Sequence, residues 1–314
     1  MTLRVVSAAE IDRALADDVL IERLHEMFKH GCEVPLRHHH HVAGSDGGAG
    51  GTLLLMPAWQ PGGPLGVKAV SVFPDNPQHG LPSVIGLYLL FDGATGAPRA
   101  VLDGVTLTQR RTAAASALAA FFLARKDASE LLMVGAGAMA PHLIRAHGVR
   151  RAIARVRIWN RHYERAERLA ATLLSQGVDA EAVTDLETAA RHADIISCAT
   201  LSHVPLIRGE WLKPGTHLDL VGGYTPEMRE ADDDAVRHAS LFVDTRSGGL
   251  KEAGDIVDPI RRGIISEADI KADLHDLCAG RHPGRRSPGE ITLFKSVGTA
   301  LEDLAAAALV MERT

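Results

Sequence analysis

The residues best suited to chemistry form a glycine-rich turn between an apolar segment and a helix-compatible one. The short apolar run Leu131–Val134 leads directly into Gly135, Gly137 and Ala140. Gly135 would permit a tight turn, Gly137 would let the backbone approach a pyrophosphate, and the small Ala140 would let the helix pack on the strand. Amides at the start of that helix would face the anion. The spacing predicts a nicotinamide or flavin dinucleotide site, the alternative being a glycine-rich turn that binds nothing.

The residues after the next expected strand bear on the choice of cofactor. Val156–Trp159 is followed by Asn160 and Arg161, with no carboxylate between them. A carboxylate there would accept a hydrogen bond from the ribose 2′-hydroxyl and repel a 2′-phosphate. An arginine could instead pair with that phosphate through two hydrogen bonds. The sequence therefore favours NADPH, with NADH as the alternative if Arg161 is merely solvated.

Two cationic segments precede the turn. Lys68 lies inside the apolar, strand-like run Gly66–Val72, and a buried lysine is costly unless it is paired. The alternative is an exposed lysine at a strand end. Arg110 and Arg111 stand near the expected start of an alanine-rich helix, Thr108–Arg125. Positive charge at a helix start opposes the helix dipole, so the placement is easier to understand if one arginine holds a carboxylate.

Four consecutive histidines follow Arg37 in the run Arg37–His41 and raise the question of a metal site. On a strand they would point alternately to opposite faces, so at most two could share one ion. No Cys, Asp or Glu lies within a few residues to complete a ligand set. We therefore expect no metal here, and a solvated or partly substrate-facing loop.

The expected elements change in character along the chain. The first hundred residues combine a helical piece, about Ala8–His30, with a meander of strands, and Gly44–Gly51 reads as a flexible loop. From residue 131 onward, strands alternate with helices, which predicts a parallel, doubly wound sheet. The expected strands are Leu131–Val134, Val156–Trp159, Ala180–Val183, Asp194–Ala199, His217–Val221 and Leu241–Val243. A last helix is expected over Phe294–Glu312.

Composition sets outer limits. The 314 residues, 46% hydrophobic and 23% charged, are typical of a globular protein. The net charge of -5 gives no reason to expect nucleic acid or an anionic membrane as partner. No apolar run approaches the roughly 20 residues that span a bilayer, and the N-terminus lacks a signal-peptide core. Three widely spaced cysteines favour a reducing cytoplasm over a disulfide framework.

Together these residues make the chain resemble the ornithine cyclodeaminase/mu-crystallin family almost end to end. The resemblance implies a homodimer and an α/β fold, in which a Rossmann-type NAD(P)-binding domain (116–293) is inserted into a mixed α+β domain (1–115 plus 294–314). That outer domain would bind substrate and form the dimer. The segments that carry the resemblance are Leu55–Trp59, Gly66–Phe73, Gly80–Val84, Leu107–Ala114, Val134–Ala138, Trp159–Arg161, Leu220–Gly223 and Phe294–Gly298.

The resemblance also implies roles for individual residues. Lys68 and Arg111 would be catalytic. The substrate would contact Arg37, Lys68, Arg111, Val297 and, as a pocket wall or proton donor, Tyr224. The resemblance adds further cofactor-binding residues to the turn glycines and Arg161. The full expected set is Ser83, Gly135, Gly137, Ala138, Met139, Asn160, Arg161, Thr200, Val221, Gly222 and Ser296.

Two departures from the family pattern narrow the activity. Ornithine cyclodeaminases resemble one another in an Asp where this chain has Tyr224, and in a Glu where it has Leu54. Without them no obvious acid/base pair remains for cyclodeamination, and no anion remains to recognise a distal ammonium. Reduction of a preformed cyclic ketimine needs only a carboxylate clamp, a hydride and one proton.

We therefore expect NAD(P)H-dependent reduction of Δ1-pyrroline-2-carboxylate to L-proline. Δ1-Piperideine-2-carboxylate, giving L-pipecolate, is the second expected substrate. The alternatives are an ornithine cyclodeaminase, an alanine dehydrogenase and a non-catalytic NADPH-binding protein.

Overall fold

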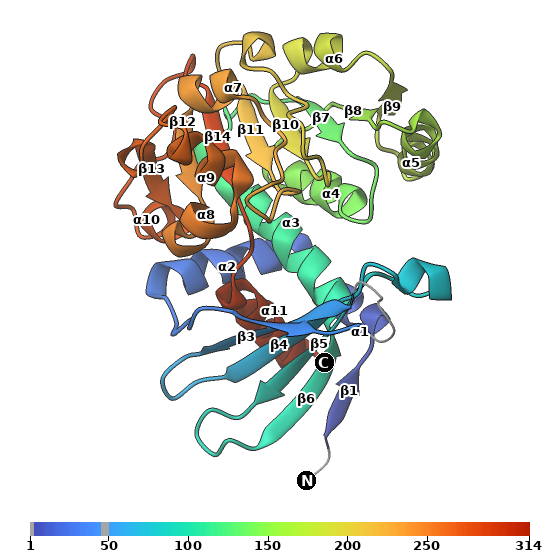
Figure 1. Cartoon of the computed structure of the whole chain (residues 1–314), viewed down its shortest axis with the longest axis vertical. Helices are drawn as coiled ribbons and strands as arrows, with labels where there is room; N and C mark the ends of the chain where they lie inside the picture. The colour runs from blue at the N-terminus through green and yellow to red at the C-terminus, as the bar shows by residue number, and fades with distance from the viewer. Residues whose placement is uncertain (1–2, 45–49) are drawn as a thin grey trace. The chain divides into compact units, whose positions relative to one another are not determined.

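The chain folds into two compact units (Figure 1). The computed structural model describes residues 3–44 and 50–314, so most of the expected Gly44–Gly51 loop lies outside the described residues. The first unit contains residues 1–111 and 299–314, and the second contains residues 112–298. Among the described residues, no helix combines the length and apolar character needed to cross a membrane.

The first unit is a six-stranded sheet with helices on one face. Its strand order is β1-β6-β5-β4-β3-β2, antiparallel except for the parallel pair of β1 and β6. The C-terminal helix α11 packs on β3, β4, β5 and α2. The elements are β1 (Arg4–Val6), α1 (Ala8–Ala14), α2 (Asp17–His30), β2 (His38–Val42), β3 (Gly51–Trp59), β4 (Leu65–Val72), β5 (Val84–Phe91), β6 (Pro98–Asp103) and α11 (Ala300–Arg313).

The second unit holds an eight-stranded, all-parallel sheet in the order β13-β12-β14-β11-β10-β7-β8-β9. From β7 the chain moves outward through β8 to β9, and then returns past β7 to β10. This reversal confirms the doubly wound fold and makes the carboxyl ends of β7 and β10 the topological switch point, where such sheets bind ligands. The strands are β7 (Glu130–Val134), β8 (Arg155–Trp159), β9 (Ala180–Val183), β10 (Ile195–Cys198), β11 (His217–Leu220), β12 (Ser240–Val243), β13 (Ile270–Asp273) and β14 (Thr292–Lys295).

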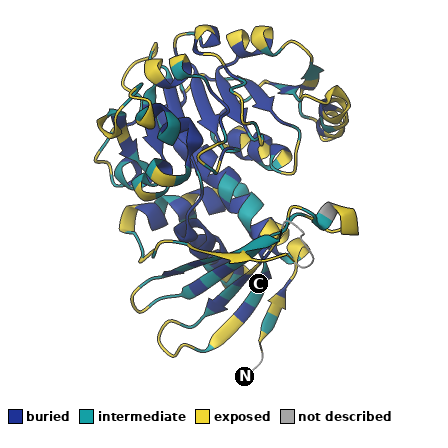
Figure 2. Ribbon diagram, in the orientation of Figure 1, coloured by how far each residue is buried: buried dark blue, intermediate teal, exposed yellow. Residues whose placement is uncertain are grey.

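Helices cover this sheet, with α6 and α7 above the strands and α4 and α5 below them in the view of Figure 1. The strands are buried over most of their length, as Figure 2 shows. Continuous apolar runs such as Leu131–Val134 arise because both faces of a parallel sheet are covered. The helices are α3 (Gly104–Leu123), α4 (Ala140–Arg150), α5 (Tyr163–Ser175), α6 (Leu186–His192), α7 (Asp233–His238), α8 (Arg246–Glu252), α9 (Gly254–Arg261) and α10 (Leu274–Cys278).

The last expected helix differs from the structure. Residues Phe294 and Lys295 belong to the buried strand β14, so the helix expected from Phe294 begins only at Ala300. A short apolar run cannot be assigned to strand or helix by periodicity alone. Gly298, at a φ of 80°, and the cap residue Thr299 separate the two elements. Because β14 pairs with β11 and β12, residues 294–298 lie in the second unit and not with the chain ends.

The histidine run is the second difference. His38–Val42 forms the edge strand β2, paired with β3, where a loop was expected. All five residues of β2 are exposed. Pairing with the long strand β3 satisfies one edge of this segment, a tertiary contact that its local sequence does not reveal.

Candidate active site

The glycine-rich turn joins β7 to α4 as the spacing predicts. Gly135 has a φ of 105°, and its N–H donates to the Trp159 carbonyl at 2.8 Å. A Cβ at Gly135 would lie 2.6 Å from the Ala199 carbonyl oxygen, whereas a Cβ at Gly137 would meet nothing within 4 Å. The fold itself therefore requires glycine at 135. The open space beside Gly137 is a cradle in which another molecule can approach the backbone.

The start of α4 suits an anion. No side chain caps the first turn of this 11-residue helix, and a proline occupies its beginning. Gly137 and Ala138 are exposed, and Met139 is half-buried. Uncapped amides together with the helix dipole favour a phosphate group at this position.

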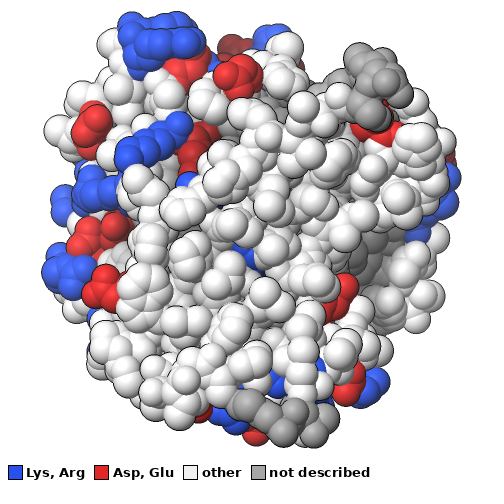
Figure 3. Space-filling view, turned by 60° about the horizontal axis from the view of Figure 1, so that its bottom comes forward, with Lys and Arg blue, Asp and Glu red and all other residues white. Residues whose placement is uncertain are grey.

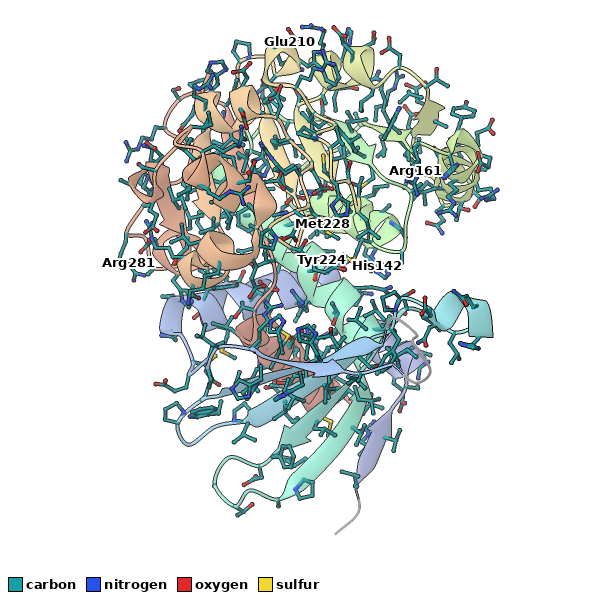
Figure 4. All side chains as sticks on the ribbon, in the orientation of Figure 1. His142, Arg161, Glu210, Tyr224, Met228 and Arg281 are labelled. Carbon is teal, nitrogen blue, oxygen red and sulfur yellow. The ribbon has the colours of Figure 1, made fainter. Side chains whose placement is uncertain are left out.

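Asn160 ties the turn to the end of the second strand. Its Oδ1 accepts from the Ala136 amide at 3.2 Å, and its Nδ2 donates to the His162 carbonyl at 2.9 Å. Arg161 is exposed on the connection from β8 to α5 (Figure 4). This connection therefore presents a cation and no carboxylate from residue 160 to residue 162.

The other expected cofactor residues of the second unit follow neighbouring strands. Thr200 comes after β10, Val221 and Gly222 come after β11, and Ser296 comes after β14. These strands are adjacent to one another and to β7, and all are parallel. The structure therefore brings these residues to one edge of the sheet, beside the glycine-rich turn.

The β14 end of this edge is held by Asp244, which the sequence analysis missed. Asp244 Oδ2 accepts from the amides of Val297 at 2.8 Å and Gly298 at 2.7 Å. Tyr224, in the segment after β11, is 45% exposed (Figure 4). Val297 is thus fixed through its backbone, while Tyr224 is accessible.

In the first unit, a buried charge cluster surrounds Asp303. Lys68 Nζ lies 2.8 Å from Asp303 Oδ2, and Arg111 Nε donates to Asp303 Oδ1 at 3.0 Å. Arg111 Nη1 also donates to Glu302 Oε2 at 2.5 Å. The four side chains come from β4, α3 and the first turn of α11, and all are at most 4% exposed. The structure therefore joins the two predicted catalytic residues through one carboxylate.

The environment sets the protonation of this cluster. Burial lowers the pKa of Lys68 to about 8, with Arg111 and Arg37 contributing and Asp303 opposing the shift. Burial alone would raise the pKa of Asp303, but Lys68 and Arg111 outweigh it and hold that pKa below its ordinary value. At neutral pH the cluster thus contains an ionised Asp303 and a Lys68 ammonium that can release its proton near physiological pH.

The structure corrects the reading of the paired arginines. Helix α3 begins at Gly104 and not near Thr108, so neither arginine stands in its first turn. Arg110 binds the protein's own Asp12 at 3.1 Å and Asp17 at 2.9 Å. Its guanidinium is therefore an internal anchor for the segment that joins α1 to α2.

The remaining expected residues of the first unit are placed as follows. Arg37 is half-buried just before β2, and its charge acts on Lys68. Ser83 precedes β5, and its carbonyl accepts from the Phe73 amide at 2.8 Å. Leu54 is two residues from Met56, the direct partner of Lys68 across β3 and β4. Leu54 therefore lies on the face of the sheet that carries Lys68.

Sequence reasoning missed Glu302 and Asp303, although a signal was present. The helix Ala300–Arg313 is apolar around most of its surface, and two of its three acidic residues, Glu302 and Asp303, stand in the first turn, where the helix dipole favours them. Buried charges require partners of opposite sign. Two acidic residues in an otherwise apolar helix therefore indicated buried carboxylates that could pair with Lys68 and Arg111.

The two turn glycines can be separated experimentally. We expect Gly135→Ala to lower the free energy of unfolding by about 1–3 kcal/mol, because a side chain there is strained and meets the Ala199 carbonyl. Gly137→Ala should leave the free energy of unfolding within about 0.5 kcal/mol of wild type. It should nevertheless weaken NADPH binding at least about tenfold, since its methyl group occupies the approach to the backbone. Urea unfolding and fluorescence titration check both variants, and unchanged binding by Gly137→Ala would contradict this assignment.

Relatives are similar to this chain in sequence over most or nearly all of its length. A Delta(1)-pyrroline-2-carboxylate reductase of Colwellia psychrerythraea is 35% identical, over 99% of this chain and 99% of its own. The ketimine reductase mu-crystallin of Mus musculus is 37% identical, over 82% of this chain and 79% of its own. These relatives cover both units.

Solved structures of the same fold also cover nearly the whole of this chain. The Thermococcus litoralis Delta(1)-pyrroline-2-carboxylate reductase, in complex with NADH and L-proline, has a TM-score of 0.92 and 35% identity, covering 99% of this chain and 97% of its own. An archaeal alanine dehydrogenase dimer with bound NAD has a TM-score of 0.91 and 29% identity, covering 100% of this chain and 96% of its own. The sequence model of the ornithine cyclodeaminase/mu-crystallin family matches residues 3–314. The resemblance drawn from the residues is confirmed, and the chain belongs to the ornithine cyclodeaminase/mu-crystallin family.

Proposed function

We propose that the protein is an NADPH-dependent reductase of cyclic ketimines that converts Δ1-pyrroline-2-carboxylate to L-proline. Δ1-Piperideine-2-carboxylate, giving L-pipecolate, is the second substrate. The observation that carries the proposal is the buried Lys68–Asp303–Arg111 cluster. The full-length similarity to proteins named Delta(1)-pyrroline-2-carboxylate reductase supports the same activity.

The second unit fits the cofactor. The space beside Gly137, the uncapped start of α4 and the Asn160 contact to the turn suit a dinucleotide pyrophosphate. Gly135, Gly137, Ala138 and Met139 would hold that group, and the remaining cofactor contacts would come from Ser83, Asn160, Thr200, Val221, Gly222 and Ser296. When bound, the reduced nicotinamide supplies the hydride that the imine carbon accepts.

The first unit supplies the polar groups for the substrate. Arg37 and Arg111 bind the substrate carboxylate, and Lys68 hydrogen-bonds to it or delivers the proton that the imine nitrogen needs. Asp303 holds Lys68 in place at 2.8 Å and keeps a negative charge beside it. Val297 and Tyr224 are the further residues that we propose as substrate contacts. One proton and one hydride added across the C=N bond give the cyclic amino acid.

Two side chains, Leu54 and Tyr224, argue against cyclodeamination. Leu54, on the Lys68 face, offers a hydrocarbon side chain where recognition of a distal ammonium needs a carboxylate. Tyr224 offers a phenol where an acid/base pair would need a second carboxylate. Ornithine cyclodeaminase is therefore the second candidate.

Lys68 gives the central test. In the wild type, NADPH oxidation with pyrroline-2-carboxylate should be flat below pH 8 and fall above it, because the ammonium is lost through a pKa of about 8. Lys68→Met should lower kcat at least about 100-fold and abolish that alkaline limb. Lys271→Met, which removes an exposed lysine of β13, is the control. No oxidation with either cyclic imine would overturn the proposal, and ammonia release from L-ornithine would support the cyclodeaminase.

Arg161 decides the cofactor in this proposal. A guanidinium on the β8–α5 connection can pair with a ribose 2′-phosphate, and no carboxylate from residue 160 to 162 repels it. Arg161→Ser should therefore lower kcat/KM for NADPH roughly 10- to 100-fold and leave that for NADH nearly unchanged. Arg168→Ser, an exposed arginine on α5, is the control. An unchanged NADPH to NADH ratio would show that the protein does not use Arg161 to choose its cofactor.

We further propose that the first unit binds substrate and forms a homodimer through the sheet face opposite α11. One row across five strands of that face is wholly apolar and consists of Pro57, Val67, Leu89, Val101 and Val5. Val5 is 74% exposed and Leu87, in the next row, is 50% exposed. In the view of Figure 3, uncharged residues cover much of the middle of the surface, and most of the Lys, Arg, Asp and Glu side chains lie toward its rim. Such a large apolar face indicates a protein partner.

Leu87→Asp tests the dimer. The charge should be tolerated in a folded monomer, because Leu87 is half exposed, but it should dissociate a dimer that buries this face. Light scattering after gel filtration should give a dimer for the wild type and a monomer for the variant. Leu174→Asp, at a 55% exposed leucine on α5, should remain dimeric. A wild-type monomer would refute the proposal.

The cysteines support a cytoplasmic location, which we include in the proposal. Cys32, Cys198 and Cys278 form no disulfide in the described structure. Burial raises the pKa of Cys32 to about 11 and that of Cys198 well above its ordinary value, so both stay protonated and unreactive. Such thiols suit a reducing compartment.

A further inference from the structure

A buried carboxylate, Glu230, connects two of the strand ends described above. Glu230 is 0% exposed. Its Oε1 accepts from both the Thr200 amide and the Thr200 hydroxyl at 2.7 Å, and its Oε2 accepts from the Gly222 amide at 2.8 Å. One side chain thus uses both oxygens to hold the segment after β10 and the segment after β11.

The two segments meet in a space too small for a side chain. A Cβ at Gly222 would lie 2.0 Å from the Thr200 carbonyl oxygen and 2.5 Å from Glu230 Oε1. The distance between the segments is therefore set by the carboxylate that lies between them and by the glycine that permits the approach.

Glu230 is itself held by a second buried carboxylate. The amides of Glu230 and Ala231 donate to Asp255 Oδ1 at 2.8 and 3.0 Å. Lys295 Nζ, at the end of β14, lies 3.3 Å from Asp255 Oδ2, and both side chains are 0% exposed. Two carboxylates and one ammonium are thus removed from water directly beneath the sheet edge.

Burying these charged groups costs free energy, which a purely structural role would not explain. Burial raises the pKa of Glu230, Asp255 adds to the rise, and Lys295 and the Thr200 hydrogen bonds oppose it. Well-packed apolar residues often stabilise a core as well as buried charges do. Glu230 instead fixes the geometry of the segments around it, since a carboxylate that accepts three hydrogen bonds defines the position of each donor.

We propose that Glu230 is a positioning residue for the cofactor, which sets the spacing of the Thr200 and Gly222 segments so that both can contact the nicotinamide half. The inference rests on the proposed function, in which Thr200 and Gly222 contact the cofactor. Glu230 acts through these backbone segments and does not touch the reacting atoms.

Glu230→Gln is the decisive variant. Its amide keeps the size of the side chain but offers only one acceptor oxygen, so one of the two segments faces an NH2 group in place of an oxygen. We expect the dissociation constant and KM for NADPH to rise about tenfold. The peptides that contain Thr200 and Gly222 should also exchange their amide hydrogens faster.

Asp194→Asn is the matched control. Asp194 is 6% exposed and accepts from the amides of Ser129 at 3.0 Å and Glu130 at 3.1 Å, at the opposite edge of the same sheet. This variant loses a comparable carboxylate and should lose stability, but its affinity for NADPH should match the wild type.

Equal NADPH affinity in Glu230→Gln and the wild type would overturn the proposal, as would unchanged hydrogen exchange at both segments. If Glu230→Gln does not fold, Glu230→Asp replaces it, because a shorter carboxylate keeps the charge but cannot reach both segments. Wild-type affinity in that variant would also refute the proposal. Hydrogen exchange needs neither cofactor nor substrate, so it still tests Glu230 if the wild type proves not to reduce imines.

Discussion

A positive charge is costly to bury unless a negative charge or several hydrogen-bond acceptors lie beside it, and Asp303 supplies the negative charge for two cations at once. Because Lys68 and Arg111 come from β4 and α3 while Asp303 begins α11, the ion pairs fix how these three elements pack. Removing Asp303 would take away the carboxylate that pairs with Lys68 in an apolar interior, which costs several kcal/mol. The same balance leaves the pKa of Lys68 at about 8, close enough to neutrality for proton transfer.

In the second unit, buried carboxylates satisfy backbone amides in the same way as Asp303 satisfies buried cations. The loops at the carboxyl edge of the sheet are short and expose amides that need acceptors. Asp244 accepts from the segment after β14, and Glu230 from the segments after β10 and β11. In the glycine-rich turn after β7, the amides of Gly135 and Ala136 donate to the Trp159 carbonyl and to Asn160 Oδ1, and the exposed segment at Gly137 and Ala138 is left for an anion. The sheet edge therefore combines segments fixed by the protein with one segment left for a ligand.

How far the sequence predicted this structure depends on the range of each interaction. The turn at Gly135 was predictable because the strand, the glycines and the helix are consecutive in the chain. Lys68 and Arg111 were predicted as site residues, yet Asp303 was not identified as their partner. It lies 192 residues from Arg111 along the chain, and sequence spacing does not encode that contact. Phe294 and Lys295, the second half of strand β14, were assigned to the last helix because four buried residues carry no periodicity.

The position of β14 has a consequence for the biogenesis of the chain. This strand lies between β11 and β12, although it is made after both of them and after β13. Until residue 295 has left the ribosome, β11 and β12 have no partner between them, and each exposes an unpaired edge that can associate with other chains. Folding of the first unit is completed later still, since α11, which follows β14 in the chain, must cover its sheet and supply Asp303 as the partner of Lys68. A nascent chain therefore has two incomplete sheets until β14 and α11, within residues 292–313, complete both.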